Sequence, residues 1–305
     1  MADTRTSDIL KMTEAGVNEV FYAAAKKPRV LEYKNICREV QGDKKICKYE
    51  SIGAIGPAIE KPEGDTLTYR KISQAYETTI ESTTKSNAVQ ATIEALKYDL
   101  KGVVESTFGE PLIRTMITLK EKTVADVYNH AFTTTSADGK VYIANDHPLV
   151  NNALKSNDNL LTGEMSTTTI VTAKNMFNSI YDQAGELFDT APTHLLIHPN
   201  KLFLALQLLQ SQLMALELSN TKNVLQDVNA VKIVTNRYLD YAAEVSPWFM
   251  LDKSLTGAGV ILQNYVPLTL DKEFTQADLS YRGACWEMYG VGMVSPGYGI
   301  VGSVG

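Results

Sequence analysis

The 305-residue sequence has few cysteines and no long apolar run. Its three cysteines, Cys37, Cys47 and Cys285, form neither a C-x-x-C metal pair nor an even disulfide framework, which fits a reducing compartment. No stretch approaches the roughly 20 apolar residues of a membrane-spanning helix. The opening residues MADTRTSDIL also lack the apolar core of a signal peptide. We therefore expect a protein that is intracellular when it is made.

Sequence motifs for catalysis are also missing. There is no Walker loop, no G-x-S-x-G elbow and no H-E-x-x-H, and no serine or cysteine is paired with a histidine in a known motif. The one G-x-G-x-x-G, at Gly297–Gly302, has no helix after it to direct backbone amides at a phosphate, so we interpret it as a flexible tail. We predict no enzyme, and no catalytic, cofactor-binding or metal-binding residues.

Positive charge is scarce outside the first 50 residues. The formal net charge is −6, made up of about +2 over residues 1–50 and −8 over the remainder. Tight binding of nucleic acid depends on lysine and arginine side chains that neutralise phosphates. The charge therefore predicts at most weak, non-specific contact with DNA.

The histidines offer the one candidate metal site. His194 and His198 are four residues apart, the spacing of two zinc ligands on one helix face, and His147 could add a third ligand. The segment THLLIH is strand-like, however, and Pro199 follows it directly, so the two rings need not converge. We favour structural histidines, and a metal-dependent hydrolase remains the least favoured alternative.

The chain is organised around residues 86–132. Apolar residues recur every three or four positions, which predicts one kinked helix or two successive helices broken at Gly109-Glu110-Pro111. The following Asp138-Gly139 pair predicts a hairpin whose return strand is KVYIANDHP. The asparagine-rich segment LVNNALKSNDNLLTGE then reads as a surface loop.

The N-terminal part has little core of its own. We predict a helix over Ser7–Lys26, followed by a charged segment, and then a two-stranded loop with an irregular tip over residues 46–76, where glycine and proline are frequent. An isolated hairpin is only marginally stable in water. A neighbouring element must therefore hold this loop or the segment before it.

The C-terminal part predicts a compact α/β unit. A helix capped near Ser166 runs toward Gly185, the strand Thr193–His198 follows, and an apolar helix begins at Pro199. We expect this helix to be buried, with Leu206 among its buried residues. The other predicted strands are Val231–Val234, Trp248–Leu251, Val260–Leu262 and a final pair around Cys285–Tyr289 and Gly292–Ser295.

The order of these features resembles the major capsid proteins of tailed phages, and most closely the branch of Mu-like head subunits. No single motif carries the likeness, which rests on collinear segments from about Ile46 onward. These are Asn129-His130-Ala131-Phe132, Asp138-Gly139 through His147-Pro148, THLLIHP at 193–199 with its apolar helix, PWFMLD at 247–252, and the ending Tyr281-Arg282-Gly283 to Val294-Ser295-Pro296-Gly297.

The resemblance implies the α+β Hong Kong 97 capsid fold, in four parts. Residues 1–45 would be an N-terminal arm and residues 46–78 an extended loop. Residues 79–159 and 263–305 would form a peripheral domain with a long spine helix. Residues 160–262 would form the axial domain, which meets its copies at the centre of each capsomer.

The implied function is assembly of hexamers and pentamers into an icosahedral head, with scaffold, portal and auxiliary head proteins as further partners and the virion as location. An encapsulin-like compartment around an enzyme cargo is the alternative. Some family members join subunits through a lysine–asparagine bond, but Lys61 is only a candidate donor without an identified acceptor. We interpret it as a solvated surface lysine.

Overall fold

The computed structural model describes most of the chain. The described residues are 31–52, 56–67, 69, 74–98, 109–211, 231–242, 246–255, 258–295 and 297–305. The predicted helix over Ser7–Lys26 and the end of the apolar helix after Ser211 lie outside them. Within the described part of the chain, no helix has both the length and the apolar character needed to cross a membrane.

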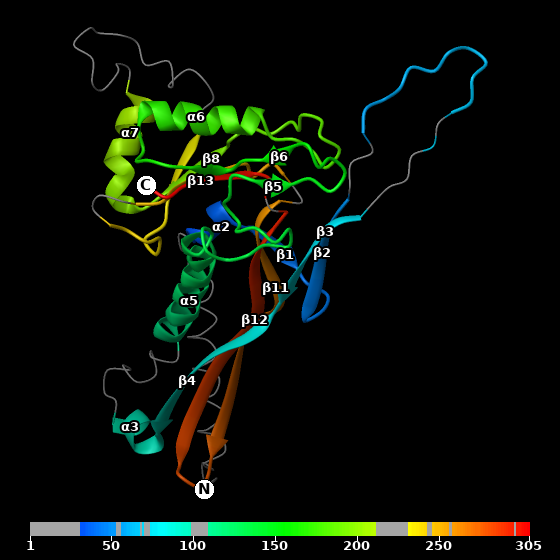
Figure 1. Ribbon diagram of the computed structural model, residues 1–305. Coiled ribbons are helices and arrows are strands. Elements are labelled where there is room, and N and C mark those ends of the chain that lie inside the picture. The colour runs from blue at the N-terminus through cyan, green and yellow to red at the C-terminus, as the bar shows by residue number, and fades with distance from the viewer. Residues whose placement is uncertain are drawn as a thin grey trace, which may run out of the picture.

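A long, narrow sheet forms the lower part of the molecule (Figure 1). Its strand order is β1-β11-β12-β4, with β11 (Gly259–Thr275) and β12 (Ser280–Val294) antiparallel over most of their length. Strand β1 (Arg38–Gln41) runs parallel to β11 at the other edge. Pro267, which has no N–H to donate, lies within the irregular stretch of the β11–β12 register between Val266 and Thr269.

The prediction that residues 86–98 are helical is largely wrong. Residues Thr83–Thr92 form strand β4, which pairs with β12, and only Ile93–Tyr98 form a helix, α3. Val89 and Ala91 also fit a two-residue period, and Val89 packs against the cluster formed by Leu112, Ile113, Met116 and Cys285. Pairing with β12 selected the two-residue period of a strand over the period of three to four residues of a helix.

The second half of the predicted helix is confirmed as the spine helix α5 (Glu110–Asn129). It begins after Gly109 with Pro111 in its first turn, where the missing N–H costs no helical hydrogen bond. The break in the sequence pattern is therefore the start of this helix. Its apolar face packs on the long sheet and, at its C-terminal end, on the sheet above (Figure 1).

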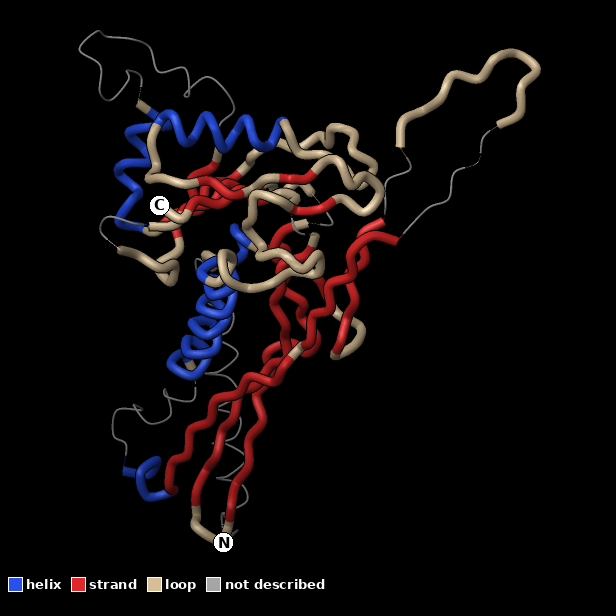
Figure 2. The backbone as a smooth tube through the Cα atoms, in the orientation of Figure 1, coloured by secondary structure: helices blue, strands red, loops and turns tan. Residues whose placement is uncertain are grey.

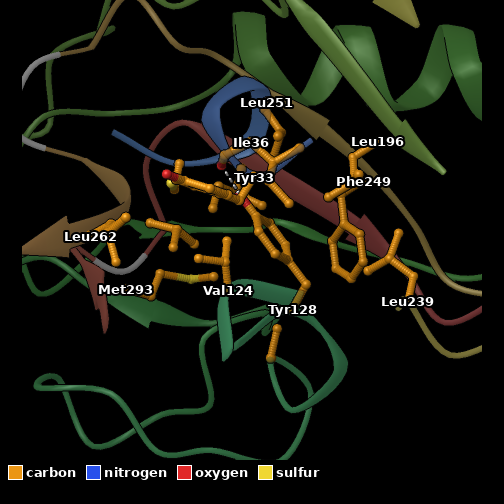
Figure 3. Packing of buried hydrophobic residues seen from close by; sticks show 14 of the residues in the cluster. Tyr33, Ile36, Val124, Tyr128, Leu196, Leu239, Phe249, Leu251, Leu262 and Met293 are labelled. Carbon is orange, nitrogen blue, oxygen red and sulfur yellow. Dashed lines mark hydrogen bonds between the residues drawn. The ribbon is translucent and has the colours of Figure 1, made fainter. Parts of the chain in front are cut away.

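The upper sheet has the order β7-β13-β10-β8-β9, formed by β7 (Leu160–Leu161), β13 (Ile300–Ser303), β10 (Trp248–Leu251), β8 (His194–Ile197) and β9 (Lys232–Thr235). Both of its faces are covered, which explains why β10 is apolar throughout. Trp248 and Met250 pack toward α6 (Thr167–Asn178) and α7 (Leu202–Gln210). Phe249 and Leu251 point to the other face, where Figure 3 shows them beside Tyr128 of α5.

The predicted cap of α6 is confirmed, and the apolar helix predicted to start at Pro199 starts there as a short 3-10 turn. Ser166 and Thr169 form a capping box at the start of α6. A short 3-10 turn, η1 (Pro199–Lys201), precedes α7. Leu206 is only half-buried, and the buried residues of α7 are Ala205 and Leu208, so the expectation that Leu206 lies in the core is wrong.

Two predictions for the C-terminal segment are wrong. The expected final strand pair is one strand, β12, and the expected flexible tail contains β13, which lies between β10 and β7 in the upper sheet. Two glycines of this segment mark close approaches of the backbone to a neighbouring strand. A Cβ on Gly290 would lie 2.6 Å from the backbone oxygen of Glu81, and one on Gly302 would lie 2.9 Å from the Phe249 ring.

The predicted two-stranded loop is confirmed. Strand β2 (Ile46–Ile52) pairs antiparallel with β3 (Gln74–Glu81), and the described residues 56–67 between them project from the body (Figure 2). The hairpin at Asp138-Gly139 is reduced to a single bridge between Thr135 and Val141. Of its expected return strand only His147–Pro148 is extended, as β5, which pairs with β6 (Ser156–Asn157).

Candidate assembly surfaces

The tip of the extended loop is exposed throughout its described residues 57–67 and 69. Lys48 and Glu77 form an ion pair of 2.6 Å across β2 and β3, and Lys45 and Glu81 one of 2.8 Å, but Glu77 is only half-buried, the other three side chains are largely exposed, and such pairs contribute little. Beyond these strands three large apolar side chains are exposed, with exposed fractions of 64% for Ile59, 64% for Leu67 and 90% for Tyr69. Apolar side chains on a projection of this kind favour burial against another molecule.

The segment before the loop is anchored in its own subunit. Helix α2 (Tyr33–Ile36) packs on α5, and Tyr33, Ile36 and Cys37 belong to the largest buried cluster (Figure 3). The Tyr128 hydroxyl donates to the Ile36 carbonyl at 2.5 Å. The expectation that residues 1–45 lack a core therefore fails from Leu31 onward, because the spine helix and the upper sheet enclose this segment.

A buried carboxylate on the spine helix fixes the start of α2. Glu121 accepts a hydrogen bond of 2.9 Å from the Tyr33 N–H, and only 6% of the residue is exposed. Burial is the main cause that raises the pKa of Glu121 to about 7, and the nearby Glu32 carboxylate raises it further. One oxygen of Glu32 is buried without a partner, while its other oxygen pairs with Arg237 at 3.1 Å.

A second buried charge joins the spine helix to the long sheet. Lys120 and Glu287 pair at 2.6 Å with little exposure of either side chain. The Lys120 ammonium also lies 4.8 Å from the centre of the Tyr289 ring. Removal of one partner would leave the other charge buried and unpaired. This pair ties the orientation of α5 to that of β12.

His147 is part of a buried polar cluster. Its Nδ1 is 2.5 Å from Asp138 Oδ2 and its Nε2 is 3.1 Å from Asn159 Oδ1. The Asn159 side chain also accepts from the Ala144 N–H and donates to the Tyr142 carbonyl. The asparagine-rich segment therefore contains the short strands β6 and β7, and its Asn157 and Asn159 are buried, unlike the surface loop predicted. The His147 ring has a structural role in holding residues 138–159 together.

The other two candidate metal ligands, His194 and His198, make their hydrogen bonds to residues outside this cluster. His194 Nδ1 lies 2.9 Å from the Thr193 hydroxyl, and His198 accepts from the Asn200 N–H and stacks on Tyr241. Burial lowers the pKa of both rings, and Lys253 and Lys232 lower that of His194 further. Among the residues that the structure covers, no three His, Cys, Asp or Glu side chains are grouped as a metal site.

Lys61 and the cysteines have no special environment for chemistry. Lys61 is exposed on the loop tip. Cys37 and Cys285 are buried and Cys47 is half-buried, all three as free thiols. Burial raises the pKa of Cys37 to about 12 and that of Cys285 to about 11, so neither thiol is activated.

Sequence reasoning missed Glu121, Asn159 and Gly290. Glu121 carries a weak signal, because it is three or four residues from Ile117, Val124 and Ala125 and so falls on the apolar face of the helix. Asn159 and Gly290 carry none, because their partners lie on segments distant in the sequence.

Known proteins resemble this chain in sequence and in fold. A family model described as phage capsid protein matches residues 75–298. The capsid of bacteriophage PhiM1 is similar in fold at 10% identity, covering 91% of this chain and 88% of that chain with a TM-score of 0.57. The capsid of cyanophage P-SCSP1u is similar at 12% identity, covering 88% and 85% with a TM-score of 0.55.

An encapsulin is similar as well. The holo-SrpI encapsulin complex from Synechococcus elongatus PCC 7942 shares 7% identity, covering 92% of this chain and 91% of that chain with a TM-score of 0.55. At identities this low, the likeness to these structures shows the fold alone. A comparison with curated proteins finds no match to the sequence.

Proposed function

Since the chain belongs to the phage capsid protein family, we propose that its copies assemble into hexameric and pentameric rings that close an icosahedral head around double-stranded DNA. The chain is a structural shell protein of the Hong Kong 97 fold and not an enzyme, and its place is the virion capsid. Assignment to the Mu-like branch remains a prediction, as do the scaffold, portal and auxiliary head proteins as partners.

The observation that carries the proposal is the extended loop. Its residues Ile59, Leu67 and Tyr69 are exposed, and its described residues 56–67 project from the body (Figure 1). We propose that this loop, together with the residues before Leu31, lies across neighbouring subunits. Burial of apolar surface is the dominant favourable term in most protein association, which favours a covered loop in the shell.

We propose a division into four parts close to the one that the resemblance implies. Residues 1–45 are the arm, 46–78 the extended loop, 79–159 with 263–305 the peripheral domain, and 160–262 the axial domain. One change is needed at the C-terminus. Ile300–Ser303 belong with the axial domain, because β13 is hydrogen-bonded between β10 and β7.

Electron microscopy of the purified protein, alone and with its scaffold, tests this function. We expect rings, tubes or closed shells. A monodisperse compact monomer under all these conditions would contradict the proposal.

The second candidate is an encapsulin-like compartment, which the likeness to the Synechococcus elongatus encapsulin favours. It predicts that a defined enzyme co-purifies inside the particles. Mass spectrometry of purified particles separates the two candidates, because a head should instead contain DNA and head proteins.

A further inference from the structure

Two neighbouring loops of the upper domain expose apolar side chains that the fold leaves uncovered. We call this patch the paired-loop surface. It comprises Val150 and Leu154 from one loop and Leu187 and Phe188 from the other, with exposed fractions of 42%, 96%, 67% and 38%. The charged side chains Glu186 and Asp189 are exposed beside it. An apolar centre with a polar rim is the usual composition of a protein interface.

The two loops are held together rigidly. Val150 N–H donates to the Gln183 side chain at 2.9 Å, and the Lys155 ammonium donates to the Gly185 carbonyl at 2.6 Å. Asn157 bonds to both the N–H and the carbonyl of Tyr181. Gly185 has a φ of +87°, and a Cβ there would lie 2.2 Å from the Asn152 side-chain amide, so glycine favours this approach. Association with a rigid surface loses less conformational entropy than association with a mobile one.

The paired-loop surface adjoins the stem of the extended loop. The Tyr76 hydroxyl, on β3, donates to the Pro148 carbonyl at 3.0 Å, at the start of the first of these loops. Figure 1 shows the extended loop and these loops on the same side of the molecule. A copy that receives the extended loop is thereby brought close to this surface.

The opposite end of the same domain exposes a second apolar surface, which we call the α7 surface, formed by Phe203 of α7 and by Tyr241, whose ring stacks on His198 just before η1. The exposed fraction of Phe203 is 83% and that of Tyr241 is 43%. The N-terminal end of α6 lies beside α7, where Lys201 is 3.5 Å from Glu164, and its C-terminal end leads into the paired loops. Helix α6 thus separates the two surfaces by about 18 Å, the length of its 12 residues.

We propose that the paired-loop surface of one copy docks on the α7 surface, around Phe203 and Tyr241, of the next copy in a ring. Rotational rings need head-to-tail contacts between two different surfaces of the same chain. The inference rests on the proposed function, which supplies the ring. It adds which residues meet: Leu154 and Leu187 on one copy and Phe203 on the other.

The first test is the double substitution Leu154→Asp and Leu187→Asp. We expect at least a tenfold loss of assembled particles by light scattering and electron microscopy, because two carboxylates would be buried in the contact. The thermal transition of the unassembled subunit should not move, since both leucines are exposed. Val171→Asp, at a 40% exposed position on α6, is the matched control and should assemble normally.

The second test uses oxidation of cysteine variants. Leu187→Cys with Phe203→Cys in one chain should give a ladder of disulfide-linked oligomers on non-reducing gels, because each copy links to the next. Either single variant should stay monomeric on the gel.

These outcomes distinguish a failure of the proposed function from a failure of the proposed docking contact. If the unaltered protein does not assemble, the proposed function fails. If it assembles and the Leu154→Asp, Leu187→Asp variant does so equally well, the docking surface is wrong. Dimers from Leu187→Cys alone would also overturn it, because they require like surfaces to meet.

Discussion

At the scale of single residues, buried polar side chains hold separate segments of the chain together. Glu121 joins the spine helix to α2, and His147 joins residues 138–159. Burial of either side chain costs free energy that only its hydrogen-bond or ion-pair partners offset. Substitution of one member should therefore be far more harmful than substitution of an exposed residue of the same type.

Glu121 predicts a pH dependence. Its pKa is raised from 4.5 to about 7 in the folded chain, so the folded state retains a proton that the unfolded chain releases above about pH 4.5. The free energy of unfolding should fall on the order of 2 kcal/mol as pH rises from about 4.5 to 7, and be level above. Glu121→Gln removes this titration while its amide oxygen can still accept from Tyr33.

Melting temperatures of the unassembled subunit between pH 5 and 8 check this. The difference between Glu121→Gln and the unaltered chain should grow with pH, whereas exposed Glu63→Gln should show no trend. A constant difference for Glu121→Gln would refute the prediction.

His147→Ala should destabilise the subunit by about 3–5 kcal/mol, because it leaves the Asp138 carboxylate buried without its partner. Urea unfolding measures the loss. His130, which pairs with Asp126 at the surface, is the matched control, and its replacement by alanine should cost well under about 1 kcal/mol. Adding Asp138→Ala to His147→Ala should recover part of the loss. Equal effects at His147 and His130 would argue against the structural role.

At the scale of elements, packing against partners decides what each segment is. Residues 83–92 carry a pattern that a helix could also satisfy, and the ladder with β12 makes them a strand. The extended loop is the opposite case. Its two strands pair with each other from Ile46 and Glu81 outward, and its tip is exposed. Its contribution should therefore be to assembly more than to the subunit.

Replacement of residues 56–67 by a short glycine-serine linker should leave the melting temperature of the subunit within a few degrees, because no buried side chain is removed. The same change should abolish stable shells in electron microscopy. A large fall in melting temperature would show that the loop supports its own subunit instead.

In α7, Leu208→Asp should destabilise the upper domain by roughly 3 kcal/mol or more, because the residue is 6% exposed in the cluster with Phe177 and Met250. Leu206→Asp is the comparison within the same helix and should cost less, since Leu206 is half-buried. Circular dichroism melts of both variants measure this order. A larger loss for Leu206→Asp would place that face of α7 in the core.

At the scale of the whole molecule, each copy carries a formal net charge of −6. Copies in a shell repel one another through this charge, and salt screens the repulsion over about 8–10 Å at physiological ionic strength. Assembly should therefore proceed further at 500 mM than at 50 mM sodium chloride, as measured by light scattering at a fixed protein concentration. Less assembly at high salt would mean that attractive charge pairs dominate the contacts.

The sequence by itself determined the parts whose signals are local. The spine helix after Gly109, the capped helix after Ser166, the strand before Pro199 and the two-stranded loop all follow from periodicity, caps and turn residues close together in the chain. The order of these parts also carried the likeness to phage capsid proteins.

Only the tertiary structure decided the parts that depend on distant partners. Strand β4 needs β12, β13 needs β10, and α2 needs the Glu121 carboxylate 88 residues away. Burial is a property of the assembled fold, so Glu121, Asn159 and Leu206 could not be assigned from their neighbours in sequence. The paired-loop surface could not be predicted from the sequence for the same reason, because the exposure of a side chain depends on where every other segment packs.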